Sequence, residues 1–263
     1  MKNLRKYGKA PFSVVVVHGG PGAAGEMAPV AQELKASGGI LEPLQTANSI
    51  EGQIEELKYQ LEKNGDLPVV LIGFSWGAWL SILFTVKYQS FVKKLILVGS
   101  GPFEEKYAGI IEETRLSRLT DLEKKKYYTV IKSLIKGSTD VKTLLNQLES
   151  VLSITDCFNR IEYNPDIGET LEFRSDIFQS VSAEAADLRR NGILLEQITL
   201  IQCPLVAIHG DFDPHPSEGV REPLSKHRKT SKFILLEKCG HRPWIEKQAQ
   251  DEFYKVLKHE IVC

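Results

Sequence analysis

A glycine-flanked serine follows directly after a short apolar segment in this chain of 263 residues. Val69–Phe74 is apolar and rich in β-branched residues, which predicts a buried strand. Trp76–Tyr88 is apolar nearly all round, which predicts a buried helix. Ser75 therefore occupies a sharp strand-to-helix turn, and the turn needs Gly73 and Gly77 because strand and helix come too close there for side chains. A chain with this turn is constrained to an α/β fold.

The same alternation of strand and helix continues along the chain. Further helices are expected at Ser49–Lys63 and Trp244–His259, from their apolar spacing. Short apolar strands that alternate with helices predict a mostly parallel central sheet with helices on both faces. The expected strands are Phe12–Val17, Ile40–Leu44, Val69–Phe74, Leu95–Val98, Leu205–Ile208 and Phe233–Leu236.

Residues 102–191 break this alternation, because they carry several amphipathic helical patterns and no clear strand. Thr120 and Glu123 have the spacing of a helix capping box, and Ser138–Asp140 offer the cap of the next helix. We expect a core domain formed by residues 1–101 and 192–263, with residues 102–191 as a small all-helical cap insertion. Insertions at the carboxyl edge of a parallel sheet lie over the ligand crevice.

The composition argues against several classes of partner. A net charge of −1 and a sequence pI of about 6.6 favour neither nucleic acid nor an anionic membrane. The uncharged stretch Leu67–Val86 has glycines and a serine at its midpoint, so it is read as strand and helix, not as a membrane span. The four cysteines form no C-x-x-C pair, and no signal peptide is recognised, which predicts free thiols in the cytoplasm.

A serine hydroxyl needs a base before it acts as a nucleophile. His241 lies in the expected loop between the last strand and the last helix, at the same edge of the sheet as Ser75. An acid behind the histidine is expected after the preceding strand, where Asp213 is preferred and Asp211 remains the alternative. His18 and His209 end strands and are read as structural, whereas His215, His227 and His259 lie in polar segments.

A glycine-rich turn, His18-Gly19-Gly20-Pro21-Gly22, follows the first expected strand. Such a turn exposes backbone N–H groups that can bind a developing oxyanion. The expected pair of donors is Gly20 and Trp76, the residue after the serine. A phosphate-binding loop is the weaker alternative, because no Lys-Ser or Lys-Thr follows.

These elements, in this order, resemble the α/β-hydrolase superfamily. The HGGPG loop and a tryptophan directly after the serine resemble its proline iminopeptidase branch. The resemblance implies a triad of Ser75, Asp213 and His241 and an oxyanion hole of Gly20 and Trp76. Members of the branch cleave an N-terminal residue or act as esterases, amidases or lactonases.

The chain departs from that branch in two ways. Its cap is smaller, and Glu162, Glu169 and Glu172 are only positional candidates for the acidic group that binds a substrate amine. Its N-terminal hairpin looks truncated, because the first clear strand begins near Phe12, so a smaller sheet is expected.

The sequence therefore predicts a serine hydrolase that cleaves an ester or amide bond of a small molecule or short peptide through an acyl-enzyme. No metal, cofactor, nucleic acid or membrane is implied. The alternatives are a proline iminopeptidase-type aminopeptidase, a lyase or acyltransferase, and a catalytically silent binding protein on the same fold.

Overall fold

A seven-stranded sheet forms the centre of the computed structural model, which describes residues 3–135, 141–161 and 172–262. The strand order is β1-β4-β2-β5-β6-β8-β9. β1 runs antiparallel to β4, and the other described pairs in this sheet are parallel. The strands are β1 (Leu4–Tyr7), β2 (Val14–Val17), β4 (Ile40–Pro43), β5 (Val69–Phe74), β6 (Val92–Val98), β8 (Leu205–Gly210) and β9 (Lys232–Leu236).

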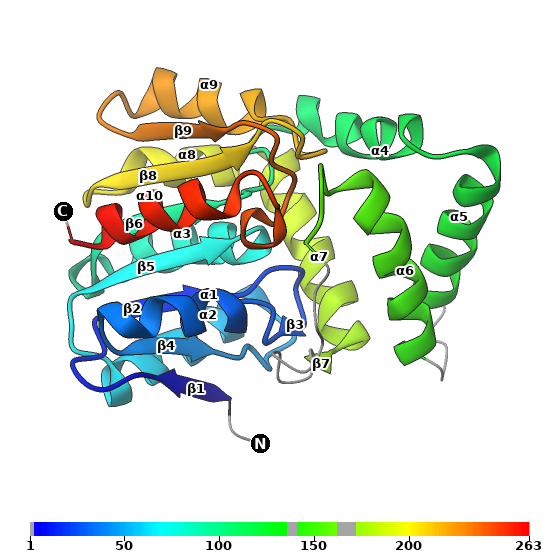
Figure 1. The fold of residues 1–263 in the computed structure, drawn as a ribbon. Coiled ribbons are helices and arrows are strands. Elements are labelled where there is room, and N and C mark those ends of the chain that lie inside the picture. The colour runs from blue at the N-terminus through cyan, green and yellow to red at the C-terminus, as the bar shows by residue number, and fades with distance from the viewer. Residues whose placement is uncertain (1–2, 136–140, 162–171, 263) are drawn as a thin grey trace.

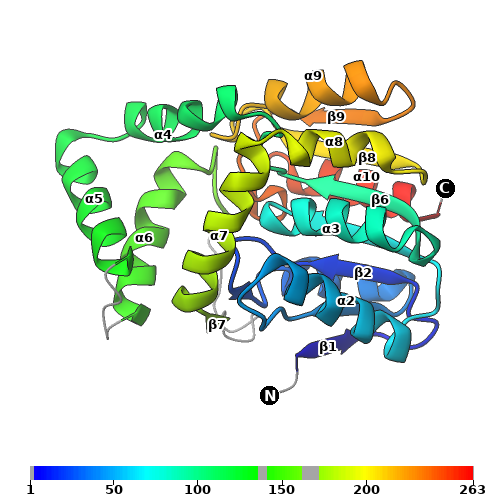
Figure 2. The ribbon, with the colours of Figure 1, turned by 180° about the vertical axis from the view of Figure 1, so that it is seen from behind.

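Helices cover both faces of the sheet, as Figures 1 and 2 show from opposite sides. Val14 and Val16 pack toward α1 and α10, whereas Val15 and Val17 pack toward α2, α3, α8 and α9. Burial of a valine side chain contributes about 1.5–3 kcal/mol, which explains why a run of four valines requires cover on both sides. These helices are α1 (Ala28–Leu34), α2 (Ile50–Asn64), α3 (Trp76–Lys87), α8 (Ile193–Leu200), α9 (Glu218–His227) and α10 (Gln250–Val262).

Each expected strand overlaps a strand of the sheet, but the expected start of the sheet near Phe12 is wrong. β1 precedes that residue and pairs with β4 at the edge of the sheet. Its sequence, LRKY, is too short and too basic to stand out as a strand. It is held by tertiary contacts, including a hydrogen bond of 2.7 Å from the Tyr7 hydroxyl to Glu42.

The expected start of the last helix is also wrong. Pro243–Ile245 form a 3-10 turn, and α10 begins only at Gln250. The backbone of this segment bonds to another part of the chain, because the Ile245 carbonyl accepts a hydrogen bond from the Ile161 N–H. Trp244 is buried in the cluster beneath α10, which fixes the segment before the helix starts.

The helices α4, α5 and α6, which follow β6, stand beyond the end of the sheet at which the parallel strands finish (Figure 1). The capping box of Thr120 and Glu123 is confirmed by hydrogen bonds in both directions, whereas Ser138–Asp140 lie outside the described residues. A two-residue strand, β7, interrupts the helices and pairs with β3 near the glycine-rich turn. These elements are α4 (Ala108–Ser117), α5 (Asp121–Ile135), α6 (Val141–Thr155), α7 (Ser175–Arg190), β7 (Glu172–Phe173) and β3 (Ala23–Ala24).

The domain limits stay a prediction. They assign residues 1–101 and 192–263 to the core and residues 102–191 to the insertion. α7 is packed on the core, because its Ile177 and Val181 are fully buried in the same cluster as α2 and α3.

Within the described ranges, no helix is long and apolar enough to cross a bilayer. Cys157, Cys203 and Cys239 are free thiols there.

The contact between α3 and the end of β2 gives a stability prediction. A Cβ atom on Gly77 would lie 2.4 Å from the Val17 carbonyl oxygen and 2.5 Å from that of His18. Gly77→Ala is expected to lower the free energy of unfolding by about 1–3 kcal/mol, the usual cost of overpacking. Urea titration measures this change.

The matched control is Gly109→Ala, in α4. Nothing lies within 4 Å of the added Cβ atom there, so the alanine should stabilise the helix by about 0.5–1 kcal/mol. Equal effects of the two substitutions would contradict the close contact at Gly77.

Candidate active site

Ser75 lies at the turn between β5 and α3 in a strained backbone conformation. Its φ is +52° and its ψ is −115°, values that few residues with a side chain adopt. The Ser75 N–H donates to the Val98 carbonyl of β6 at 3.0 Å, which anchors the turn. A Cβ atom on Gly73 would stand 2.3 Å from the Gly77 carbonyl oxygen, so both flanking glycines are needed. The geometry is that of a nucleophile elbow.

Three side chains from distant parts of the chain meet at this turn. The Ser75 Oγ lies 3.2 Å from His241 Nε2, and His241 Nδ1 lies 2.8 Å from Asp213 Oδ2. Ser75 follows β5, Asp213 follows β8, and His241 follows β9, so all three stand at the carboxyl edge of the parallel strands. The three predicted residues are thus brought together in one chain of hydrogen bonds.

Asp213 is fully buried beside His241, whereas Asp211 binds a backbone N–H group. The Asp211 carboxylate accepts a hydrogen bond of 3.1 Å from the Cys239 N–H, which shapes the loop before His241. Burial by itself raises the pKa of Asp213, but His241, His215 and His209 outweigh burial and hold that pKa well below its usual range. Asp213 is therefore a carboxylate at neutral pH, suited to orient His241.

The two predicted oxyanion donors belong to neighbouring loops. β2 and β5 are adjacent, but the chain leaves β2 toward β4 and leaves β5 toward β6, so this is a topological switch point. Gly20, in the loop after β2, has a φ of +52°. The Trp76 N–H belongs to the first turn of α3, where the helix supplies no acceptor. Their role as a pair of donors stays a prediction.

Comparison with known proteins identifies the family of this chain. The sequence profile of the alpha/beta hydrolase fold family matches residues 37–248. The chain belongs to the alpha/beta hydrolase fold family. It is a hydrolase.

Two relatives and one solved structure illustrate the similarity. The proline iminopeptidase of Thermoplasma volcanium is 22% identical, covering 93% of this chain and 86% of that protein. The proline iminopeptidase of Saccharolobus solfataricus is 27% identical, with 95% and 84% covered. The crystal structure of VinJ superimposes with a TM-score of 0.72 at 17% identity, with 98% and 94% covered. At that identity the solved structure shows the fold alone.

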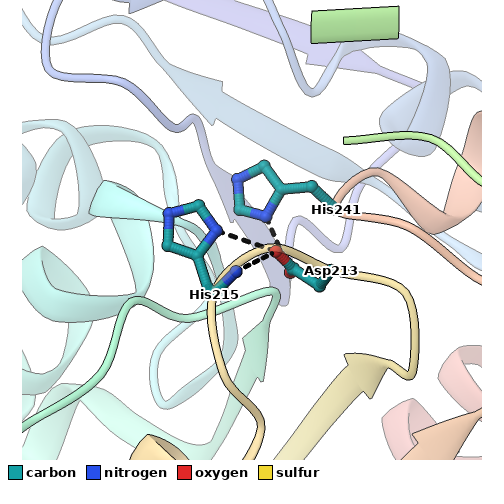
Figure 3. A group of neighbouring side chains, drawn as sticks. All are labelled: Asp213, His215 and His241. Carbon is teal, nitrogen blue, oxygen red and sulfur yellow. Dashed lines mark hydrogen bonds and ion pairs between the residues drawn. The ribbon is translucent and has the colours of Figure 1, made fainter. Parts of the chain in front are cut away.

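A second histidine shares the acid of this hydrolase, and the sequence interpretation missed it (Figure 3). The His215 Nδ1 and backbone N–H lie 2.8 Å and 2.9 Å from Asp213 Oδ1. Its ring stacks on that of His241 with centroids 4.3 Å apart and planes 24° apart. Phe74 contacts His241 as well, at 4.8 Å between centroids. In the sequence, the only sign that His215 belongs to the site is its position two residues after Asp213.

His209 supports this arrangement from below. It is buried, its Nε2–H donates to the His215 carbonyl oxygen at 2.8 Å, and the same nitrogen lies 3.5 Å from Asp213 Oδ2. His209, for which the sequence predicts a structural role, therefore lies against Asp213.

The insertion holds the loop that carries His241. The His241 N–H donates to the Asp156 carbonyl at 2.7 Å, and Arg115 of α4 binds the Asp156 carboxylate through two hydrogen bonds. The buried Glu246 carboxylate accepts hydrogen bonds from the N–H groups of Gly240, Phe158 and Asn159, each at 2.9 Å. The end of α6 and the segment after it thus fix the position of His241. The sequence shows none of these contacts.

The candidate acids for a substrate amine are not placed. Glu162 and Glu169 lie outside the described residues, and Glu172 falls in β7, in a stretch where only the backbone is described.

His18 gives a pH prediction for the loop of Gly20. Its ring is fully buried and holds the loop through hydrogen bonds with Gly19 O and the Gln45 N–H. Burial lowers the pKa of His18 from 6.5 to about 4, against those hydrogen bonds. Between these two values the unfolded chain binds a proton that the folded chain does not, so stability falls as pH falls. The slope from this one group reaches about 1.4 kcal/mol per pH unit.

His18→Gln keeps an acceptor for the Gln45 N–H but does not titrate. The free energy of unfolding, measured in urea from pH 7 to pH 5, should fall less steeply in this variant than in the wild type. His227→Gln, at an exposed site at the end of α9, is the control and should keep the wild-type slope. An unchanged slope in His18→Gln would show that the folded and unfolded chains protonate His18 alike, which would contradict its lowered pKa.

Proposed function

We propose that this chain is a serine hydrolase that cleaves an ester or amide bond of a small substrate through an acyl-enzyme. The hydrogen-bonded path from Ser75 Oγ through the His241 ring to Asp213 carries the proposal. A base within reach of a serine at a strained turn is the arrangement that activates a hydroxyl. Membership in a hydrolase family supports the same reaction class.

The steps follow from the positions of these groups. Ser75 Oγ attacks the substrate carbonyl carbon while His241 Nε2 takes the hydroxyl proton. Asp213 holds the Nδ1–H tautomer of His241 and stabilises the imidazolium without taking its proton. The Gly20 and Trp76 amides donate to the oxyanion. His241 then protonates the leaving group, and water releases the acyl group by the same path.

Ser75→Ala is expected to lower kcat by about 10⁴-fold or more, because the acyl-enzyme can no longer form. Initial rates on a short-chain nitrophenyl ester measure the loss, and a fluorophosphonate should label the wild type but not the variant. Turnover near the wild-type level in Ser75→Ala would rule out the proposal.

The two aspartates of the loop after β8 form a matched pair. Asp213→Asn should lower kcat by roughly 10⁴-fold, because an amide favours the wrong tautomer of His241. Asp211→Asn keeps an acceptor for the Cys239 N–H, so its rate should stay within a few-fold of the wild type. A larger loss of kcat in Asp211→Asn than in Asp213→Asn would identify Asp211 as the acid instead.

A proline iminopeptidase-type aminopeptidase is the second candidate. It is supported by the two relatives that bear this name and by the HGGPG loop. Such an enzyme needs a carboxylate for the substrate amine, and Glu26 lies beside the loop, with Oε2 2.7 Å from where a Cβ on Gly19 would stand. Burial raises the pKa of Glu26 despite the charges of Arg242 and His241. A substrate ammonium beside this carboxyl would favour its charged form.

Paired rates on the nitrophenyl ester and on a proline arylamide separate the two candidates. If the aminopeptidase reading is correct, the wild type cleaves the arylamide, and Glu26→Gln raises its KM for the arylamide but not for the ester, which carries no amine. Cleavage of the ester alone would leave a serine hydrolase without aminopeptidase activity. The partners and the cytoplasmic location stay predictions.

A further inference from the structure

Asp213, His215 and His241 form a group of two imidazoles and one carboxylate. Their potential ligand atoms all lie within 4.8 Å of one another. Figure 3 shows both rings facing the same carboxylate. Imidazole nitrogen and carboxylate oxygen together suit divalent transition metals such as Zn²⁺, Ni²⁺ and Cu²⁺. The acylation chemistry proposed above does not use His215.

The distances are close to those of a metal site. His215 Nδ1 lies 2.8 Å from Asp213 Oδ1, and His241 Nδ1 lies 2.8 Å from the other oxygen, Oδ2. Zn–N and Zn–O bonds of about 2.0–2.2 Å in a tetrahedral site place neighbouring ligand atoms about 3.3 Å apart. The two hydrogen-bonded contacts therefore have to open by about half an ångström, and the remaining ligand atoms already lie within 4.8 Å of one another. The ring planes are 24° apart, so the two rings also have to rotate toward the shared ion.

The surroundings favour binding in two further ways. The His215 backbone N–H donates to Asp213 Oδ1, and His209 lies against Oδ2, so the carboxylate is oriented by a second set of contacts. Partners of this kind raise the affinity of metal sites. The side chains of His215 and His241 are 13% and 12% exposed, so solvent reaches the group.

We propose that Asp213, His215 and His241 bind a divalent transition-metal ion, represented by Zn²⁺, and that the bound ion inhibits the enzyme. The binding rests on this geometry alone, whereas the inhibition rests on the proposed function. The ion is an inhibitor in this proposal and takes no part in the reaction.

The inhibition follows from the proton on His241. An imidazole that binds the ion through the Nδ1 lone pair carries its proton on Nε2, so the proton moves from Nδ1 to Nε2 and none is released. His241 Nε2 then presents an N–H to Ser75 Oγ and cannot take the hydroxyl proton. Asp213, bound to the ion, no longer orients the ring.

Calorimetric titration with Zn²⁺ tests the binding without relying on activity, and Ser75→Ala serves as a second, inactive protein that retains the site. His215→Asn removes the ligand nitrogen and keeps a side chain that can donate a hydrogen bond. His227→Asn, at an exposed site, is the control. We expect one Zn²⁺ per chain in the wild type, in Ser75→Ala and in His227→Asn, with at least about tenfold weaker binding in His215→Asn.

Equal affinity of the wild type and His215→Asn, or no binding to either, would overturn the proposed site. Mg²⁺ and Ca²⁺, which prefer oxygen ligands, should not bind. Co²⁺ absorption bands that appear in the wild type and are lost in His215→Asn would support the same ligands.

Ester hydrolysis tests the inhibition, with each variant compared with its own metal-free rate. The Zn²⁺ concentration for half inhibition should rise by the same factor as the dissociation constant in His215→Asn, and a chelator should restore the rate. Binding without inhibition would overturn the inhibitory half of the proposal. A Ser75→Ala variant that keeps its activity would refute the proposed function and leave the calorimetric result standing.

Discussion

A buried carboxylate at Asp213 is the constraint around which the site is arranged. A charge with no exposure to water is costly unless hydrogen bonds and opposite charges surround it. His241 and His215 supply those contacts through their rings, and the His215 backbone N–H adds a third. The requirement to satisfy this carboxylate therefore positions the ring that faces Ser75.

The loop of His241 depends in turn on the insertion. Its backbone and that of Gly240 are bound by Asp156 and by Glu246, and Glu246 also binds the chain just after α6. A Cβ atom on Gly240 would lie 2.0 Å from the Asp156 carbonyl oxygen, so the two segments are packed without spare room. Any movement of the end of α6 would displace His241. The position of His241 is thus coupled to the insertion through these backbone contacts.

The residues proposed for acyl transfer overlap with those proposed to bind a metal ion. Asp213 accepts from two histidines because it has two oxygens, and only one of those histidines faces the serine. The ring of His215 packs against that of His241 and brings a second nitrogen to the carboxylate. The proposed acyl transfer and the proposed metal binding therefore depend on the same ring of His241.

The sequence by itself determined the elements that local patterns encode. The valine run, the apolar segment before Ser75 and the glycines on either side specify strand, turn and helix, and their order specifies the parallel sheet. These features were predictable because burial on both faces and steric crowding at a turn act over a few residues.

Tertiary structure alone decided the rest. β1 is a strand only because β4 offers it an edge, and α10 starts late because the backbone before it binds the insertion. His215 joins the site because the loop after β8 folds its ring against His241. In each case the decisive partner lies tens of residues away along the chain, and a contact of that kind leaves no periodicity in the sequence.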